Sequence, residues 1–276
     1  MRLFQLIFGI ILIIQPAFGQ RCLSPNKQLN VAFSVIEKGV PTYQIQHKQK
    51  PVILESSMGF ELVKDDDLME DFKVLNIIYD TKDKVWNPVW GEEREIRNHY
   101  NEMLVLLEQE VTNRKMNIRF RVYDDGVGFR YEFPTQKNLG NFVIKHERTS
   151  FALTGDHIAH WIPGDYDTQE FDYMTSRISE IEFLFDEAYV GNESQEKFSN
   201  TGVQTSLMLK SDDGLYINIH EAALIDYPAM HLNLTPKTLT FKSWLTPDAQ
   251  GIMAYMTIPH NTPWRKIGRA SCRERV

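Results

Sequence analysis

Alternation of apolar and polar side chains with a period of two residues is the feature that most constrains the fold of this chain. In residues 117–123, three apolar side chains fall on one face of an extended segment and two arginines fall on the other. Residues 124–126 read Asp-Asp-Gly, and Asp and Gly tolerate the positive φ that a tight turn requires. Residues 128–133 are again strand-like. This stretch therefore predicts a β-hairpin.

The same signals recur along the chain, and helical spacing is rare. A second Asp-Asp-Gly at residues 212–214 precedes a strand-like run at 215–219. Only residues 176–188 have the spacing of a short helix, and the charged residues 64–71 are expected to form a loop or turn. Many strands with short turns predict an all-β fold with little helix, in which two sheets form one large β-sandwich. Further strands are predicted at residues 31–36, 43–47, 103–107, 142–145, 207–210, 239–244 and 254–258.

The N-terminus is typical of a secretory signal peptide. Arg2 precedes an almost unbroken apolar run at residues 3–14, and small residues follow at 17–19. The apolar run is shorter than the ~20 residues that a membrane helix needs. The residues just before Cys22 are polar and bulky, unlike those of a lipid-attachment site. Residues 1–19 are therefore predicted to be a signal peptide, and the mature protein is predicted to be exported without a membrane anchor.

The C-terminus has a different character from the rest of the chain. Residues 267–276 look like the in-frame translation of a sequencing adapter, and residues 266–276 are interpreted as a non-native tail. The native domain is then expected to cover residues 20–265, and the native protein to continue beyond them. Cys272 falls in this tail, so Cys22 would be the one native cysteine of the segment, and no internal disulfide is expected.

Composition excludes several classes of function. A formal net charge of −7 disfavours nucleic acid as a partner and fits a neutral or cation-assisted ligand. The sequence contains no Gly-x-Ser-x-Gly nucleophile motif, no phosphate-binding glycine loop and no His-Glu-x-x-His zinc motif. The residues alone therefore point to no complete catalytic site.

Residues 161–173 combine carboxylates and aromatic rings in a segment that Pro163 and Gly164 keep irregular. Hard oxygen ligands of this kind suit calcium, and rings beside carboxylates suit a sugar. The segment is equally explained as a solvated acidic loop that its rings anchor to a core. The carboxylates are Asp165, Asp167, Glu170 and Asp172, and the rings are those of Trp161, Tyr166, Phe171 and Tyr173.

Two other constellations allow both functional and structural interpretations. Residues 86–100 contain Trp-Asn-Pro-Val-Trp followed by many charges, which suits a polar groove or a salt-bridged surface loop but not a central strand. His220 and Glu221 could form an acid/base or metal pair. Adjacent residues on a strand point to opposite faces, so we expect one of them to be buried and hydrogen-bonded and the other to be solvated.

Several of these runs together resemble glycoside hydrolase family 97, most closely its exported α-glucosidases. The resemblance covers nearly all of residues 20–265 and corresponds to the N-terminal domain of such an enzyme. It implies a galactose-mutarotase-like β-super-sandwich, followed by a (β/α)₈ barrel that carries the catalytic acid and base. The runs are residues 86–100, 128–133, 155–173, 201–209, 212–224, 244–248 and 262–265.

The resemblance also implies a metal and a site residue. The family binds one calcium ion (Ca²⁺) at its active site, and the N-terminal domain contributes one carboxylate from the Gly-Asp-Tyr-Asp-Thr-Gln-Glu loop, here Glu170. Calcium would then be shared with the chain's own (β/α)₈ barrel, and the full-length protein would cleave α-linked oligosaccharides in the periplasm. The present chain by itself is expected to hydrolyse no glycoside and to bind calcium weakly.

Two alternatives remain open at this stage. The chain could be an independent, non-catalytic carbohydrate-binding β-sandwich, with the tryptophans of residues 86–90 as its sugar platform. It could also be the N-terminal domain of a retaining α-galactosidase, because another branch of the same family retains configuration.

Overall fold

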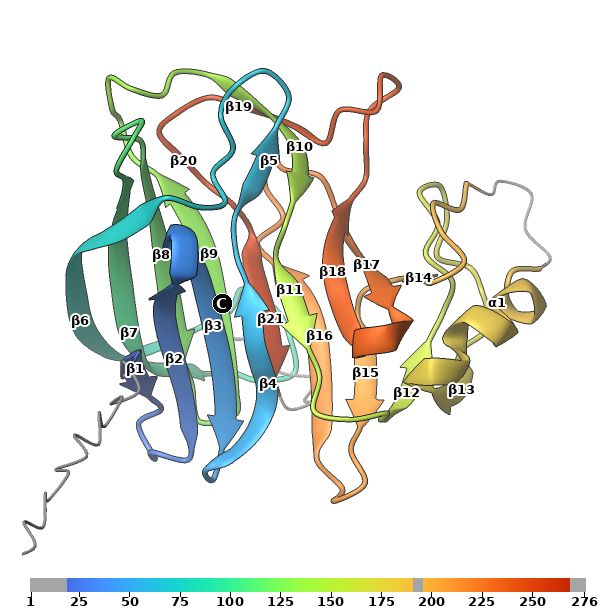
Figure 1. Cartoon of the computed structure of the whole chain (residues 1–276). Coiled ribbons are helices and arrows are strands. Elements are labelled where there is room, and N and C mark those ends of the chain that lie inside the picture. The colour runs from blue at the N-terminus through green and yellow to red at the C-terminus, as the bar shows by residue number, and fades with distance from the viewer. Residues whose placement is uncertain (1–18, 191–195, 269–276) are drawn as a thin grey trace, which may run out of the picture.

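A ten-stranded antiparallel sheet forms one layer of the molecule, and three smaller sheets lie side by side against it (Figure 1). The computed structural model describes residues 19–190 and 196–268. The large sheet has the order β13 (Met174–Arg177), β12 (Ile158–Trp161), β15 (Leu207–Lys210), β16 (Tyr216–Ala222), β21 (Trp264–Gly268), β9 (Gly126–Phe133), β8 (Lys115–Val122), β7 (Ile96–Gln109) and β6 (Phe72–Trp86), and β20 (His260–Asn261) pairs with β9.

The opposite layer contains two four-stranded sheets and a three-stranded sheet. Ile53 forms an isolated bridge with Leu153, which links the first four-stranded sheet to the segment that follows β11. The two layers confirm the predicted all-β sandwich. The strand orders are β1 (Gln20–Leu23), β2 (Leu29–Ile36), β3 (Val40–His47) and β4 (Lys50–Ser57); β19 (Ala254–Met256), β10 (Phe142–Glu147) and β5 (Phe60–Leu62); and β11 (Ser150–Ala152), β18 (Thr240–Leu245), β17 (Met230–Thr235) and β14 (Gly202–Val203).

Helix is scarce, as expected, and the predicted helix at residues 176–188 begins later than the sequence suggested. Ser176 still pairs with Ala159 in the large sheet, and the Arg177 amide then donates to the Glu180 carboxylate at 2.7 Å. Tertiary pairing thus keeps the first residues extended. The helical elements are η1 (Glu37–Gly39), η2 (Ile178–Glu180), α1 (Ile181–Ala188) and η3 (Pro236–Thr238). None of the helices in the described part is long and apolar enough to cross a membrane.

Aromatic side chains fill the space between the two layers. Phe129 in β9 is fully buried, and its ring centroid lies 4.8 Å from that of Tyr43 in the opposite layer. Phe120 in β8 pairs with Phe129 across the hairpin, at 5.7 Å between ring centroids. The predicted hairpin of residues 117–133 is therefore confirmed, and the apolar face of its alternating pattern forms the core.

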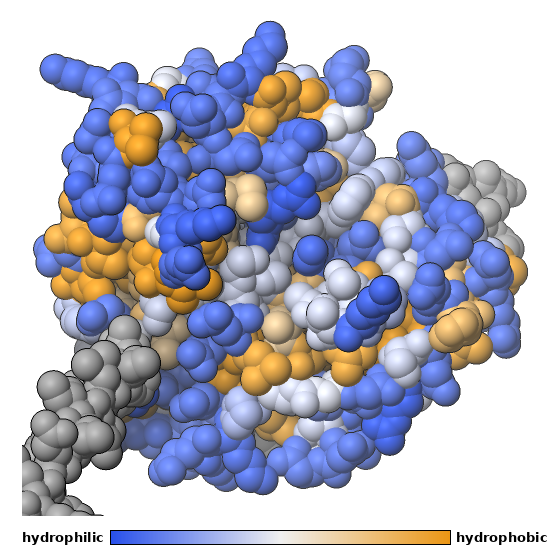
Figure 2. All heavy atoms as spheres, viewed as in Figure 1, coloured by the Kyte–Doolittle hydropathy of each residue, from blue (hydrophilic) through white to orange (hydrophobic). Residues whose placement is uncertain are grey.

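β6 was not predicted, although it is 15 residues long. It is the edge strand of the large sheet and pairs with β7 along its length. Most of its side chains are exposed, including Leu75, Ile78 and Tyr79, and apolar spheres appear at the left of Figure 2, where Figure 1 places β6. Because neither face is covered in the described part, nothing imposed the alternation that marks a half-buried strand.

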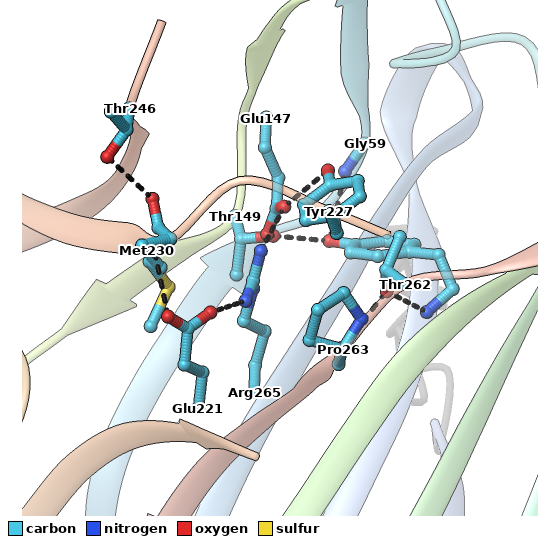
Figure 3. Close-up of polar contacts among 12 residues, drawn as sticks. Gly59, Glu147, Thr149, Glu221, Tyr227, Met230, Thr246, Thr262, Pro263 and Arg265 are labelled. Carbon is cyan, nitrogen blue, oxygen red and sulfur yellow. Dashed lines mark hydrogen bonds and ion pairs between the residues drawn. The ribbon is translucent and has the colours of Figure 1, made fainter. Parts of the chain in front are cut away.

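A buried ion cluster joins the two layers near the C-terminal strand (Figure 3). Arg265 is fully buried in β21 and donates to both carboxylate oxygens of Glu147, at 2.8 and 2.6 Å. Its other terminal nitrogen donates to Glu221 in β16 at 2.8 Å. Thr149 and Tyr227 donate to Glu147 as well, at 2.8 and 3.0 Å. Every member of this cluster therefore has a partner, which a buried charge requires.

The cluster sets the ionisation of its carboxylates. Burial alone would raise the pKa of Glu147, but the charge and hydrogen bonds of Arg265 outweigh it and hold that pKa below its usual value. Burial raises the pKa of Glu221, and Arg265 offsets this only in part. Both carboxylates are paired with the guanidinium of Arg265. Glu147 accepts two hydrogen bonds from it, and Glu221 accepts one.

Candidate functional site

The acidic segment forms a loop between β12 and β13 at the edge of the large sheet, beside α1 (Figure 1). Its first half is fastened to residues 196–204. Pro163 forms an isolated bridge with Val203, Asp165 forms one with Lys197, and the Gly164 amide donates to the Gly202 carbonyl at 2.9 Å. The segment is thus irregular, as Pro163 and Gly164 predicted, yet its first half is tied down.

Asp165 is the buried member of the four carboxylates, with 1% of its surface exposed. Its Oδ1 accepts the amides of Asp167 and Thr168 at 2.9 and 3.1 Å. Its Oδ2 accepts the Tyr189 hydroxyl at 2.7 Å and the Glu196 amide at 2.8 Å. Four donors occupy the two oxygens, so this carboxylate organises the protein rather than a metal ion.

One stack of rings supports the loop from the side of α1. Trp161 lies nearly parallel to Phe185, Phe185 to Tyr189, and Tyr189 to Phe171, with centroid separations of 6.4, 5.6 and 5.1 Å. The Trp161 Nε1–H donates to Ser176 Oγ at 3.0 Å. The stack therefore anchors both ends of the acidic loop, since Trp161 precedes it and Phe171 lies near its end.

A second stack supports the loop from the opposite layer. The Phe198 ring stacks on both Tyr166 and Trp244, at 5.4 Å from each ring centroid, and the Trp244 Nε1–H donates to the Tyr166 hydroxyl at 2.5 Å. A Cβ on Gly164 or Gly202 would come within 2.6 or 2.5 Å of the Phe198 ring. Glycine is needed at both positions because Phe198 is also packed against the rings of Tyr166, His231 and Trp244. The interpretation of the rings as anchors is confirmed for Trp161, Tyr166 and Phe171, whereas Tyr173 is 65% exposed.

Glu170 lies on the solvent side of this supported loop. Its side chain is exposed, and its amide donates to Thr168 Oγ1 at 3.1 Å. Phe171, the next residue, is buried. Glu170 therefore presents its carboxylate outward while its neighbour holds the main chain.

An outward carboxylate fits one ligand of a calcium ion, but not a complete site. Calcium takes 6–8 oxygen ligands. Across residues 19–190 and 196–268, no group of three or more His, Cys, Asp or Glu side chains is placed to hold a metal ion. These residues therefore show no cluster of three such side chains around Glu170.

The other two constellations take structural positions. Residues 87–95 connect β6 to β7, so the tryptophan run is not a central strand, as predicted. Trp90 is 87% exposed. Glu221 points into the buried ion cluster, whereas His220 is half-buried and pairs in register with Lys266 in β21. The expectation of one buried, hydrogen-bonded member is confirmed for Glu221, but His220 is half-buried rather than solvated.

Some residues that matter here were missed from the sequence. Asp165 was grouped with the three other carboxylates, although it is the buried one of the four and both its oxygens accept hydrogen bonds. Phe198 and Tyr189 carried no local signal, because their partners lie in other segments of the chain. Arg265 appeared only as the last residue of the family-like runs, and nothing in its neighbourhood predicted two buried carboxylates as partners.

The sandwich and its anchored acidic loop define a large all-β domain with one supported loop at the edge of its main sheet. The chain belongs to glycoside hydrolase family 97 and is the N-terminal domain of an enzyme of that family, because the family model described as Glycosyl-hydrolase 97 N-terminal matches residues 22–272.

Solved structures agree with this assignment. A family 97 enzyme from Pseudoalteromonas sp. strain K8 in complex with acarbose is 31% identical over 91% of this chain, with a TM-score of 0.78. A complex of that family 97 enzyme with panose gives the same identity, coverage and TM-score. A β-arabinopyranosidase is 18% identical with a TM-score of 0.74, covers 91% of this chain and 40% of its own, and shows the fold alone. The chain spans 35% of the length of the Pseudoalteromonas enzyme.

The predicted boundary at residue 265 lies within a strand. β21 runs from Trp264 to Gly268, and Ile267 is buried and pairs with Ile219 and Val127. Residues 269–276 and the signal peptide up to residue 18 lie outside the described residues. The non-native origin of residues 266–276 and the signal peptide at 1–19 therefore stay predictions.

Proposed function

We propose that this chain is the N-terminal domain of an exported, calcium-dependent α-glucosidase, and that Glu170 supplies one calcium ligand. The remaining ligands, the general acid and the base would belong to a (β/α)₈ barrel of the same protein. The observation that carries the proposal is the difference between two carboxylates of the acidic loop. Asp165 is buried and accepts hydrogen bonds from within the protein. Glu170 is exposed, on a main chain held by Thr168 and Phe171.

The proposed chemistry divides between the ion and this chain. A bound calcium ion would place positive charge where negative charge develops during cleavage of the glycosidic bond. The contribution of this chain is to hold one carboxylate at a fixed place on a supported loop, so that little ordering is left to occur when the ion binds.

An α-linked oligosaccharide is the proposed substrate of the whole protein. The support is that a family 97 enzyme 31% identical to this chain was solved with panose, an oligosaccharide of α-linked glucose units. This favours an α-glucosidase over the retaining α-galactosidase branch. The apolar N-terminal run supports export, and the periplasm is the proposed location.

Replacing Glu170 by glutamine should weaken calcium dependence in the protein that contains both this domain and its barrel. Loss of one charged ligand should raise the free calcium concentration needed for half-maximal hydrolysis by about 10–100-fold or more. Mutating a group that only hydrogen-bonds to a metal ligand already weakens metal affinity by about that factor. The measurement is the rate of α-glucoside hydrolysis against buffered calcium. Glu182→Gln on α1 is the matched control, because it makes the same change at an exposed residue. Identical calcium curves for wild type and Glu170→Gln would contradict the proposal.

The 276-residue chain alone should neither hydrolyse a chromogenic α-glucoside nor bind calcium tightly. Too few ligands surround Glu170 within the described residues to satisfy the ion. Calorimetry should therefore detect no submicromolar calcium binding. Turnover by the purified chain, or submicromolar affinity, would refute this expectation.

A non-catalytic carbohydrate-binding module is the second candidate, and the exposed tip of the β6–β7 hairpin favours it. Trp90 and Trp86 are 87% and 43% exposed, and exposed rings can stack on sugars. Binding of a malto-oligosaccharide by the chain alone, abolished by Trp90→Ala, would select this candidate over the calcium-ligand role.

A further inference from the structure

The Asp165 carboxylate connects three stretches of chain that meet beneath the acidic loop. Its donors are the loop's own amides at Asp167 and Thr168, the hydroxyl of Tyr189 just after α1, and the amide of Glu196 on the returning segment. The side chain is almost completely buried, so water does not compete for these bonds.

Two short routes lead from this carboxylate to the main chain on either side of Glu170. On the N-terminal side, the Thr168 amide donates to Asp165, and Thr168 Oγ1 accepts the Glu170 amide at 3.1 Å. On the C-terminal side, the Tyr189 hydroxyl donates to Asp165, and the Tyr189 ring stacks on Phe171 at 5.1 Å. The main chain on both sides of the proposed ligand, at Thr168 and Phe171, is thus held through one buried group.

We propose that Asp165 is a positioning residue, which fixes the main chain from Thr168 to Phe171 and thereby the place where Glu170 presents its carboxylate. The expected effect on calcium binding rests on the proposed function. The effect of Asp165 on the conformation of the loop does not, because it depends on this chain alone. Asp165 itself contributes no ligand, because its oxygens are occupied by four donors.

Asp165→Asn is the sharpest variant, because it keeps the shape and removes an acceptor. If the new amide oxygen serves Asp167 and Thr168, the amide nitrogen faces the Tyr189 hydroxyl and the Glu196 N–H. The hydroxyl can turn to accept, but the Glu196 N–H then meets another donor and loses its bond. The variant therefore releases the returning segment and loosens the loop.

Hydrogen–deuterium exchange followed by mass spectrometry tests this hold directly. We expect peptides covering residues 164–173 to exchange about tenfold faster in Asp165→Asn, since losing one buried hydrogen bond changes local opening by about that factor. Peptides from β7, β8 and β9 should not change. Glu182→Gln, at an exposed position of α1, is the matched control and should leave both regions unaltered. Unchanged exchange at 164–173, or equally faster exchange throughout the sandwich, would overturn the proposal.

Tyr189→Phe is a second, milder variant in case Asp165→Asn does not fold. It keeps the ring that stacks on Phe171 and deletes only the hydroxyl donor to Asp165. We expect faster exchange in the same peptides by a smaller factor. No change in them would count against the route through Tyr189.

The calcium dependence of the two-domain protein separates positioning from general stability. Asp165→Asn should raise the calcium needed for half-maximal activity several-fold, while kcat at saturating calcium returns close to the wild-type value. A lower kcat that calcium does not restore, or an unaltered calcium curve in a variant whose loop exchanges faster, would overturn the positioning role. If even Glu170→Gln leaves the calcium curve unchanged, the proposed function fails instead, and the exchange data still decide whether Asp165 holds the loop.

Discussion

Replacing Arg265 by methionine should lower the free energy of unfolding by about 3–5 kcal/mol, the cost of leaving a buried charge without its partner. Arg265 is fully buried and is the cation that Glu147 and Glu221 share. Removing it strands Glu147, which is also inaccessible to solvent. The measurement is urea unfolding at neutral pH. A loss of this size would consume much of the ~5–15 kcal/mol that stabilises a typical domain.

The matched control for Arg265→Met is Arg97→Met. Arg97 makes a bidentate ion pair with Asp83 at the surface, where such a pair contributes only ~0–1 kcal/mol. An Arg265→Met variant within about 1 kcal/mol of the wild type would show that the cluster is not the central ionic contact of the sandwich. Combining it with Glu147→Gln and Glu221→Gln should recover part of the loss, because the stranded charges are then absent.

The effect of Arg265→Met should also depend on pH. In the wild type the pKa of Glu147 is held below the ordinary glutamate value of 4.5, so its ionised form contributes stability above that pH and loses it as the pH falls. In the variant, burial without a cation favours the protonated acid. The stability difference between wild type and variant should therefore narrow as the pH falls. The narrowing begins above pH 4.5, where the variant's buried acid takes up its proton, and continues below pH 4.5, where Glu147 of the wild type does.

Replacing Trp161 by alanine should cost about 3–5 kcal/mol, the usual range for removing a large aromatic side chain from a core. Trp161 is fully buried, stacks on Phe185 of α1, and donates to Ser176. Its loss leaves a cavity between the large sheet and α1 and removes the first ring of the stack that ends at Phe171. Thermal and denaturant unfolding measure the change in the free energy of unfolding. Faster hydrogen exchange of the α1 amides would show that the loss of stability is local to that helix.

Trp90→Ala is the matched control, because it removes the same side chain from the exposed tip of the β6–β7 hairpin. Surface substitutions of this kind usually change stability by less than about 0.5 kcal/mol. Equal effects of the two substitutions would contradict the assignment of Trp161 to the core. A stable Trp161→Ala variant with unchanged exchange in α1 would show that the ring stack does not support the acidic loop.

The local sequence pattern was sufficient to predict the sandwich, but not its edge strand β6 or the start of α1. Strands with one buried face, such as β8 and β9, were predicted because burial imposes a period of two. β6 was missed because neither of its faces is buried. The start of α1 was misplaced because Ser176 is held in the sheet by Ala159, a partner that no helix pattern reveals.

The sequence predicted which segment holds the candidate site, but not which role each of its carboxylates has. Residues 161–173 were singled out by their carboxylates and rings, and Glu170 was named from family resemblance. What separates Glu170 from Asp165 is their surroundings, since both are acidic residues of one loop. The donors that saturate Asp165 include Tyr189 and Glu196, which lie 24 and 31 residues further along the chain.

The amino-acid sequence alone was sufficient for the all-β architecture and the main hairpin, because the period of two is visible along the chain, and for the family, because several of its runs resemble known members. Which carboxylate is buried and which faces outward was settled only when distant segments met. Arg265 reaches Glu147 across 118 residues, and the rings of Tyr166, Phe198 and Trp244 meet from three separate stretches. The state of a charged or aromatic side chain depends on what surrounds it in space, and that neighbourhood is created by folding.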